Sequence, residues 1–479
     1  MFPTLVLMVL LCLAPGSLAC DAGASPFKST GIVCRVTKPA ALVLNQQTTQ
    51  VIQAAFRHAK YPSMKGEKSI LFIGKVLYGL NNLEIHNLSI GKSEVELREN
   101  DAIGIEIHNV SATFKGALHY GYGSWLINLG HSVDFEIESH IDLRVNTKLY
   151  CGKGRVAADT SDCTLTFHKL LLHLQGDKQP GWMKKRFTDF ISFTVKLVIK
   201  SQICKEINTV ANILADFIQA RAELFLSDGD IGVDISLTTS PSMRASYIES
   251  HHKGLVLYRK VPSSFLNESV FSPALLSESR MLYFWISDQV LNPMVKAAHE
   301  DRRFIRHIAG DELKIISSEN PVAKVWSLAA PELSMVPQGT IVKSAAAVEL
   351  RINSSNAESP ALYIETDVEV AVQASYANKK LFLDANPVSI SIRKVSDSAG
   401  MDLDTDSDMD YFKEMIHRIG IPKVISYLEP GLTSLMDRNR LNLFEIINPE
   451  IITQEGYVVI QLDFGFPHHL LVDFLKKKL

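Results

Sequence analysis

The sequence lacks the motifs and the charge that would assign it to a common enzyme or nucleic-acid-binding class. It contains no G-x-S-x-G elbow, HExxH zinc helix, C-x-x-C pair or G-x-G-x-x-G turn. It has 49 Lys and Arg against 52 Asp and Glu, a net charge of −3. A nucleic-acid-binding domain carries a strongly basic patch instead. We therefore predict a protein that is not an enzyme, holds no metal and binds no nucleic acid.

Cysteine is also scarce. Six cysteines occur in 479 residues, and five remain after the apolar N-terminal run: Cys20, Cys34, Cys151, Cys163 and Cys204. Five are too few to build a fold on disulfides, and an odd number leaves at least one unpaired. The spacing alone does not choose the pairs.

Long apolar runs are absent after the first residues of the chain. Residues 1–19 are apolar and end in Ser17-Leu18-Ala19, which predicts a removed secretory signal and a mature start at Cys20. A lipoprotein signal acylated on Cys20 is the weaker alternative. No later stretch could span a membrane, so we expect a secreted, extracellular protein. Four N-x-S/T sequons predict glycosylation at Asn87, Asn109, Asn267 and Asn353.

Hydrophobic periodicity predicts the same plan twice. In the first half, residues 31–61 have helical spacing, residues 103–107 and 133–145 alternate as long strands, a long helix follows Pro180, and residues 231–237 form a strand. In the second half, residues 280–299 are predicted to be helical, residues 341–392 to form strands, residues 411–436 to be helical, and residues 456–463 to form a strand. The length favours two domains.

The C-terminal segment 463–479 is predicted to form a short amphipathic helix that begins near Pro467. Its apolar face would carry Leu470, Leu471, Val472, Phe474, Leu475 and Leu479. A helix this short is marginal alone in water, so it needs an apolar surface. The pattern leaves three roles open: a helix docked on the core, a lipid-contacting lid, and a partner-binding helix.

Two further segments contain residue types found in functional sites. Ser250, His251 and His252 place a nucleophile beside two bases, and on a strand Ser250 and His252 share one side while His251 faces away. No orienting acid accompanies them, so they are either polar residues lining an apolar cavity or ordinary strand residues. The acidic run 402–410 lacks the Gly and Glu of a calcium loop and is read as a solvated loop.

Several stretches resemble the lipid transfer and lipopolysaccharide-binding protein family, in its cholesteryl ester transfer branch. They are GIVCRVTKPA (31–40), FHKLLLHLQG (167–176), QICKEIN (202–208), SDGDIGVDISL (227–237), ESHHKG (249–254), SRMLYFW (279–285), INPEIIT (447–453) and the tail motif DFGFP–HLLVDFL. The resemblance covers nearly the whole mature chain.

The resemblance implies an α+β fold: an elongated boomerang of two barrel-like domains, each a twisted antiparallel sheet with long helices, joined by a central sheet. The implied division is a signal peptide at 1–19, an N-terminal barrel domain with part of the central sheet at 20–240, a central sheet and linker at 241–279, a C-terminal barrel domain at 280–462, and the amphipathic helix at 463–479.

The resemblance also implies a Cys163–Cys204 disulfide and an apolar tunnel for neutral lipid. The implied lipid-binding residues are Gln219, Arg221, Ser250 and His252 near the openings, Phe284 and Phe444 in the tunnel, and Leu470, Leu471, Phe474 and Leu475 on the tail, which favours the lid. The family pattern is not followed at residues 312–337, nor by the basic end Lys476-Lys477-Lys478.

The implied function is exchange of cholesteryl ester and triglyceride, with phosphatidylcholine also bound, among the high-, low- and very-low-density lipoproteins of plasma. The alternative is a phospholipid transfer protein or a host-defence lipopolysaccharide binder of the same fold. A lipopolysaccharide binder should have a strongly basic N-terminal domain to meet phosphates. Residues 20–240 hold 24 Lys and Arg against 22 Asp and Glu, a balance that favours neutral cargo.

Overall fold

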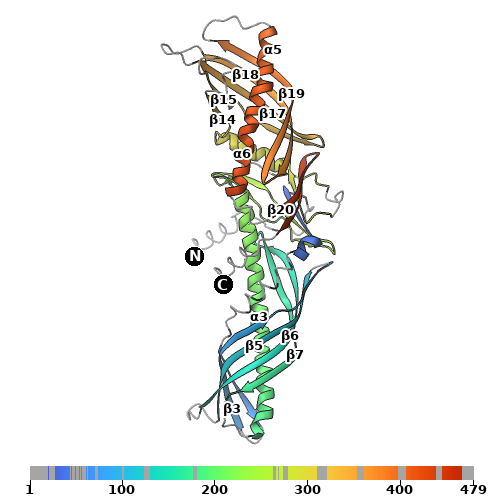
Figure 1. Cartoon of the computed structure of the whole chain (residues 1–479), viewed down its shortest axis with the longest axis vertical. Helices are drawn as coiled ribbons and strands as arrows, with labels where there is room; N and C mark the ends of the chain where they lie inside the picture. Colours follow the sequence, from blue (N-terminus) through green and yellow to red (C-terminus); the bar gives the residue numbers. More distant parts are fainter. Residues whose placement is uncertain are drawn as a thin grey trace, which may run out of the picture.

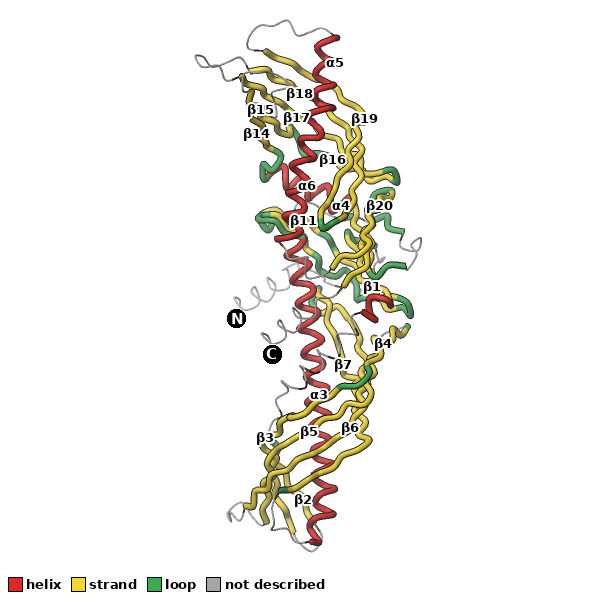
Figure 2. The backbone as a smooth tube through the Cα atoms, in the orientation of Figure 1, coloured by secondary structure: helices red, strands yellow, loops and turns green. Residues whose placement is uncertain are grey.

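The computed structural model shows an elongated molecule with a long curled sheet toward each end and a smaller sheet between them (Figure 1). It describes residues 20, 27–43, 45, 49, 53, 56, 61, 63–70, 74–99, 102–122, 130–175, 181–262, 266–267, 269–272, 279–309, 321–352, 361–397, 406–438 and 445–465. A long helix runs along each of the two end sheets (Figure 2). The predicted α+β fold with two barrel-like halves is confirmed.

The N-terminal sheet is an antiparallel meander in the order β2-β3-β5-β6-β7, with β4 paired to β5. Its strands are β2 (Met64–Ile70), β3 (Gly74–Ser89), β4 (Ser93–Arg98), β5 (Ala102–Tyr122), β6 (Gly130–Gly152) and β7 (Arg155–Leu174). The alternation predicted for residues 103–107 and 133–145 falls inside β5 and β6. Phe135, Ile137 and Ile141 point inward and are buried, whereas their neighbours face solvent.

Helix α3 (Gly181–Phe225) lies against this sheet and confirms the long helix predicted after Pro180. Val195, Ile199 and Ile203 recur at every fourth position and are almost fully buried. This spacing places them on one side of the helix. They pack with the inward side chains of the strands into a single apolar cluster.

The central sheet joins segments from both ends of the chain in the order β20-β21-β13-β1-β10-β9. Its strands are β1 (Ile32–Thr37), β9 (Ser242–Met243), β10 (Tyr247–His252), β13 (Leu282–Ser287), β20 (Glu445–Gln454) and β21 (Tyr457–Gly465). Strand β21 confirms the strand predicted at 456–463. The helix predicted for 31–61 is wrong at its start, because residues 32–37 form β1. The described residues between positions 38 and 56 are helical.

The helix predicted for 280–299 is wrong in its first half for a related reason. Residues 282–287 form β13, and helix α4 (Asp288–Glu300) begins only after Ser287, whose hydroxyl accepts a hydrogen bond from the Gln289 amide at 3.2 Å. Tyr283, Trp285 and Ser287 all face one buried side of the strand. An aromatic run as short as LYFWIS cannot be distinguished from a helical segment by periodicity alone.

A three-stranded sheet of β8 (Ile231–Asp234), β11 (Leu255–Tyr258) and β12 (Val261–Pro262) packs beside α4. Strand β8 confirms the start of the strand predicted at 231–237. Its apolar side chains form a cluster with Ile32 of β1, Val290 of α4 and Ala222 of α3. The C-terminal end of α3 is thereby attached to the central sheet.

The C-terminal sheet repeats the plan in the order β14-β15-β17-β18-β19, with β16 paired to β17. Its strands are β14 (Ile305–Ala309), β15 (Pro321–Ser327), β16 (Glu332–Val336), β17 (Gly339–Ile352), β18 (Ala361–Ala377) and β19 (Lys380–Asp397). Helix α5 (Asp406–Met415), the π-helical turn η3 (Ile416–Gly420) and α6 (Ile421–Arg438) pack on β19. These elements confirm the strands and the helix predicted for 341–392 and 411–436.

Candidate functional site

The interior of the N-terminal half is apolar along its length. Fully buried side chains from β5, β6 and α3 meet there. The largest are Phe56, Ile107, Phe114, Leu118, Phe135, Ile137, Ile141, Leu143 and Ile199. A curled sheet closed by a helix around such side chains encloses one continuous apolar core.

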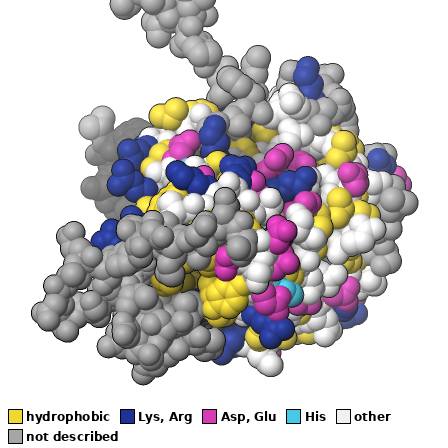
Figure 3. Space-filling model, turned by 90° about the horizontal axis from the view of Figure 1, so that it is seen from above, with side chains coloured by type: hydrophobic (Ala, Val, Ile, Leu, Met, Phe, Trp, Pro, Cys, Tyr) yellow, Lys and Arg dark blue, Asp and Glu magenta, His cyan; other side chains and the backbone are white. Residues whose placement is uncertain are grey.

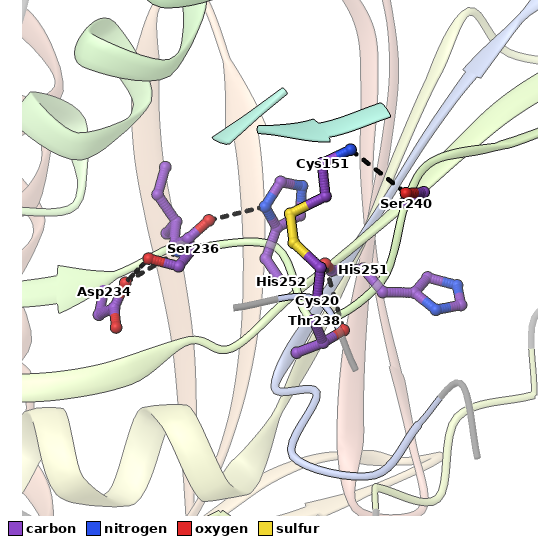
Figure 4. Close-up of a disulfide and its surroundings, with 9 residues drawn as sticks. Cys20, Cys151, Asp234, Ser236, Thr238, Ser240, His251 and His252 are labelled. Atoms are coloured by element: carbon purple, nitrogen blue, oxygen red, sulfur yellow. Dashed lines mark hydrogen bonds between the residues drawn. A yellow bond between two sulfur atoms is a disulfide. The ribbon is translucent and has the colours of Figure 1, made fainter. Parts of the chain in front are cut away.

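Two disulfides hold this half together. Cys163 of β7 is bonded to Cys204 of α3, with their Cα atoms 5.8 Å apart, so the pairing implied by the resemblance is present. Cys20 is bonded to Cys151 at the end of β6, a pair that the sequence left open. Figure 4 shows this second disulfide beside the segment that follows β8 and carries Ser236 to Ser240, where the Cys151 amide donates to Ser240 Oγ at 3.2 Å.

Ser250 and His252 lie on the same side of β10, as predicted from strand alternation. Ser250 Oγ is 2.8 Å from His252 Nε2, and His252 Nδ1 is 2.8 Å from the Ile235 carbonyl oxygen. Because a carbonyl only accepts, Nδ1 carries the proton and Nε2 accepts from the serine hydroxyl. Burial lowers the pKa of His252, so the imidazole is neutral at physiological pH. His251 faces away from His252 (Figure 4), and its Nε2 forms a hydrogen bond with the Glu249 carboxylate.

This pair does not have the geometry of a hydrolase. In a catalytic triad a carboxylate behind the imidazole stabilises the imidazolium that forms when serine loses its proton. Here the group behind His252 is the Ile235 carbonyl. Ser250 can orient a polar ligand group, but nothing in this arrangement favours its ionisation.

Phe284 lies on the same face of the central sheet as Ser250. Cys34 of β1 is opposite Ser250 of β10 on one side and opposite Phe284 of β13 on the other. Adjacent strands are about 4.8 Å apart, so a serine, a thiol and a phenyl ring form a row across three strands. Burial raises the pKa of the Cys34 thiol to about 12, with a smaller contribution from Glu249. The thiol is therefore protonated at neutral pH.

The opposite face of the central sheet holds a buried charged group. Arg35 donates from Nε and Nη2 to Glu249 Oε2 at 3.0 and 2.7 Å, and His251 Nε2 is 2.9 Å from Glu249 Oε1. The Arg35 guanidinium also lies 3.9 Å from the centre of the Tyr247 ring. Burial alone would raise the pKa of Glu249, but the hydrogen bonds from His251 and Arg35 outweigh it and lower that pKa. The carboxylate stays ionised inside the sheet.

Gln219 is buried near the end of α3, where its side-chain amide donates to Glu223 at 3.3 Å. Glu223 in turn accepts from Arg155 at 3.1 Å. One helical turn after Gln219, Ala222 packs against the apolar cluster that contains Ile235. The Ile235 carbonyl oxygen accepts the hydrogen bond from His252 Nδ1. The structure thus attaches the Gln219 end of α3 to the segment after β8 that lies behind the Ser250–His252 pair.

Comparison with known proteins decides the family. The chain matches the LBP / BPI / CETP family, N-terminal domain, over residues 41–217 and its C-terminal domain over residues 226–318. It is 51% identical to the cholesteryl ester transfer protein of Gallus gallus, over 98% of this chain and 97% of that protein. It is 47% identical to that of Homo sapiens, over 97% of this chain and 98% of that protein. The chain belongs to the LBP / BPI / CETP family.

Solved structures with lower sequence identity to this chain also align with it. The crystal structure of lipopolysaccharide binding protein aligns with a TM-score of 0.49 and 17% identity, over 91% of this chain and 99% of that one. Within the part of the chain that the structure describes, no helix is long and apolar enough to cross a membrane. The same residues contain no group of three His, Cys, Asp or Glu arranged to hold a metal ion.

Some predicted site residues are not placed by the structure. Phe444, the tail residues Leu470, Leu471, Phe474 and Leu475, and the sequon Asn353 lie outside the described residues, as does the side chain of Arg221. Asn87, Asn109 and Asn267 are exposed, as glycosylation requires. The lipid-binding roles of the predicted site residues and the glycosylation of the sequons stay predictions.

Sequence reasoning missed the Arg35–Glu249 pair and two buried donors. The Tyr61 hydroxyl and the Trp285 indole N–H are the two buried side-chain groups without a hydrogen-bond partner among the described residues. The lone Arg within the β-branched segment IVCRVT was the one available signal for the charged pair. The lack of a partner for a donor depends on three-dimensional packing and has no sequence signal.

Proposed function

We propose that this chain is a secreted lipid-transfer protein of plasma that exchanges cholesteryl ester and triglyceride, and also phospholipid, among lipoproteins. The partners would be high-, low- and very-low-density particles. The observation that carries the proposal is 46–51% identity to four proteins named cholesteryl ester transfer protein, over 96–98% of the chain. The apolar N-terminal interior is consistent with neutral cargo.

The physical task is to move a molecule that water excludes. Each CH₂ group exposed to water costs about 0.8 kcal/mol, so a neutral lipid with tens of such groups rarely leaves a particle unaided. A tunnel lined like the α3 interior would remove that barrier, and lipid gradients between particles would set the direction. No covalent step is required, so we propose a carrier and not an enzyme.

Polar groups would hold the phospholipid, which has a charged head. Ser250 and His252 offer a hydroxyl and a neutral imidazole on one face of the central sheet, and Gln219 offers an amide at the end of α3. Arg221 would add a cation, and Phe284 and Phe444 would line the tunnel. The apolar face of the tail, with Leu470, Leu471, Phe474 and Leu475, would close an opening or contact the particle surface.

The charge distribution supports neutral cargo over an anionic bacterial lipid. Lys, Arg, Asp and Glu side chains are interspersed on the end of the molecule that carries α5 and β18 (Figure 3). The N-terminal residues 20–240 are nearly balanced, with 24 Lys and Arg against 22 Asp and Glu. A lipopolysaccharide binder would gain from a large basic surface that attracts phosphates.

Two measurements on the purified full-length protein test the function. Mass spectrometry of lipid extracted from it should find cholesteryl ester and triglyceride, and it should move labelled cholesteryl ester from high- to low-density lipoprotein. A protein that carries no neutral lipid and transfers none would contradict the proposal. Preferential binding of lipopolysaccharide would select the alternative family function, and release of fatty acid would select an enzyme.

A further inference from the structure

The Tyr61 hydroxyl is a hydrogen-bond donor without a partner inside an apolar region. Its oxygen is buried and makes no hydrogen bond among the described residues. The ring packs against the apolar cluster of the N-terminal half. It meets the Phe114 ring edge-on, with the centroids 6.0 Å apart. The hydroxyl therefore lies in the interior that we propose holds neutral lipid.

Leaving such a group unpaired is costly. A buried donor without a partner destabilises a protein by about 1–3 kcal/mol, and the great majority of buried polar side-chain atoms are paired. Burial, assisted by the negative charge of Glu206, raises the pKa of Tyr61. The phenol is therefore a donor at every physiological pH. Glu206 itself accepts a hydrogen bond from Gln202 at 3.1 Å.

We propose that Tyr61 Oη recognises the ester carbonyl of the neutral lipid bound beside Phe114. This inference rests on the proposed function and adds a specificity residue to it. Apolar side chains bind hydrocarbon without distinguishing an ester from an ether or an alkane. One fixed donor in such a site discriminates, because a lipid without a carbonyl places no acceptor oxygen at that position and leaves the hydroxyl unpaired.

The second buried donor without a partner among the described residues, the Trp285 indole N–H, lies in another part of the molecule. Trp285 Nε1 lies in β13 of the central sheet, on a ring stacked against Tyr283 and 5.2 Å from the Arg35 guanidinium. Tyr61 instead contacts the side chains of the α3 interior. Of the two donors, Tyr61 is the one that lies in the apolar interior proposed to hold neutral lipid.

The test compares two probes that differ in one carbonyl. Full-length protein is delipidated and equilibrated with cholesteryl oleate or with its ether analogue, cholesteryl oleyl ether, in a neutral emulsion. The variant is Tyr61→Phe, and the control is Tyr78→Phe, which removes a hydroxyl from another tyrosine packed on the same cluster. A neutral hydrogen bond contributes roughly 0.5–1.5 kcal/mol, so the wild type should prefer the ester by about 2- to 12-fold.

In Tyr61→Phe the ester should bind as weakly as the ether, with ether binding unchanged, whereas Tyr78→Phe should keep the preference. The lipid-free variant should melt at or above the wild-type temperature, because an unpaired hydroxyl has been removed. Equal binding of ester and ether by the wild type would overturn the role of Tyr61 while leaving lipid transfer intact. A lipid-free Tyr61→Phe that melts lower or does not fold would also overturn it, since the hydroxyl must then have a protein partner. Absence of binding of either probe to the wild type would overturn the proposed function as well.

Discussion

Arg35 and Glu249 face each other across β1 and β10, and Arg35 Nη2 lies 2.7 Å from Glu249 Oε2 inside the central sheet. The two residues are 214 positions apart in the chain. Both side chains are almost fully buried. Because β1 is the middle strand that connects β10 to β13, this pair lies where segments from the two halves of the chain meet.

Replacing Glu249 with Gln should destabilise the protein strongly. The change leaves the Arg35 charge buried without its carboxylate, and breaking a buried pair on one side costs about 3–5 kcal/mol. We expect a lower melting temperature and poor secretion. The control is Glu99→Gln, which breaks an exposed pair with Arg244 and should change little. Equal melting of Glu249→Gln and wild type would show that the buried pair does not stabilise the sheet.

The folded protein should become less stable as the pH falls below neutrality. The pKa of buried His252 is lower in the folded protein than its usual value of 6.5. The unfolded chain therefore takes up a proton first, so stability is full above pH 6.5 and is lost as the pH falls toward the folded pKa. Thermal melting between pH 8 and 5 should show this loss, and His252→Gln should reduce it. His119→Gln, at an exposed imidazole, should keep the wild-type profile; if it reduces the loss equally, His252 is not the responsible group.

Local patterns explain which parts of the fold were predictable. Period-two alternation identified β5 and β6, and the helical spacing of apolar residues after Pro180 identified α3, because each pattern depends only on which side of one element is buried. Strand β1 was missed because its buried side carries Arg35. That residue is compatible with burial only through Glu249, far away in the sequence.

The candidate site was also predictable only in the features that depend on a single strand. Alternation placed Ser250 and His252 on one side of a strand, and the structure agrees. The group behind the imidazole is the Ile235 carbonyl, whose position depends on how the neighbouring strands meet. Likewise, the five cysteines did not identify Cys20–Cys151, because that pairing depends on the end of β6 lying beside Cys20 in the folded chain.

Removing the Cys163–Cys204 disulfide should impair folding. It closes a loop of 41 residues between β7 and α3, and in the chain-entropy model such a cross-link contributes roughly 4 kcal/mol. We expect Cys163→Ala to be secreted at a small fraction of the wild-type yield. Cys34→Ala, at the cysteine that is free in the structure, is the control and should be secreted nearly normally. Non-reducing peptide mapping that pairs Cys163 with another cysteine would contradict the assignment.

The predicted tail helix should matter for transfer rather than for folding. Phe474 is the largest side chain on its apolar face, and burying such a side chain is worth roughly 1.5–3 kcal/mol. Phe474→Glu should be secreted and melt normally but lose most neutral-lipid transfer. Asp473→Asn, on the polar face, should transfer at about the wild-type rate. If Phe474→Glu fails to fold, the tail is part of the core, and if it transfers cholesteryl ester normally, the tail is not a lid.

Ser250 should orient phospholipid without cleaving it. Ser250→Ala removes the hydroxyl that donates to His252 Nε2 and leaves that buried nitrogen unpaired, at a cost of about 1–3 kcal/mol. We expect a modest drop in melting temperature and less phospholipid extracted from the purified variant, with neutral-lipid content closer to wild type. Ser250→Thr keeps a hydroxyl and should restore part of the phospholipid. Incubation of wild type with labelled phosphatidylcholine should release no fatty acid, because the His252 imidazole is backed by a carbonyl. Fatty acid released by wild type but not by Ser250→Ala would instead make Ser250 a nucleophile.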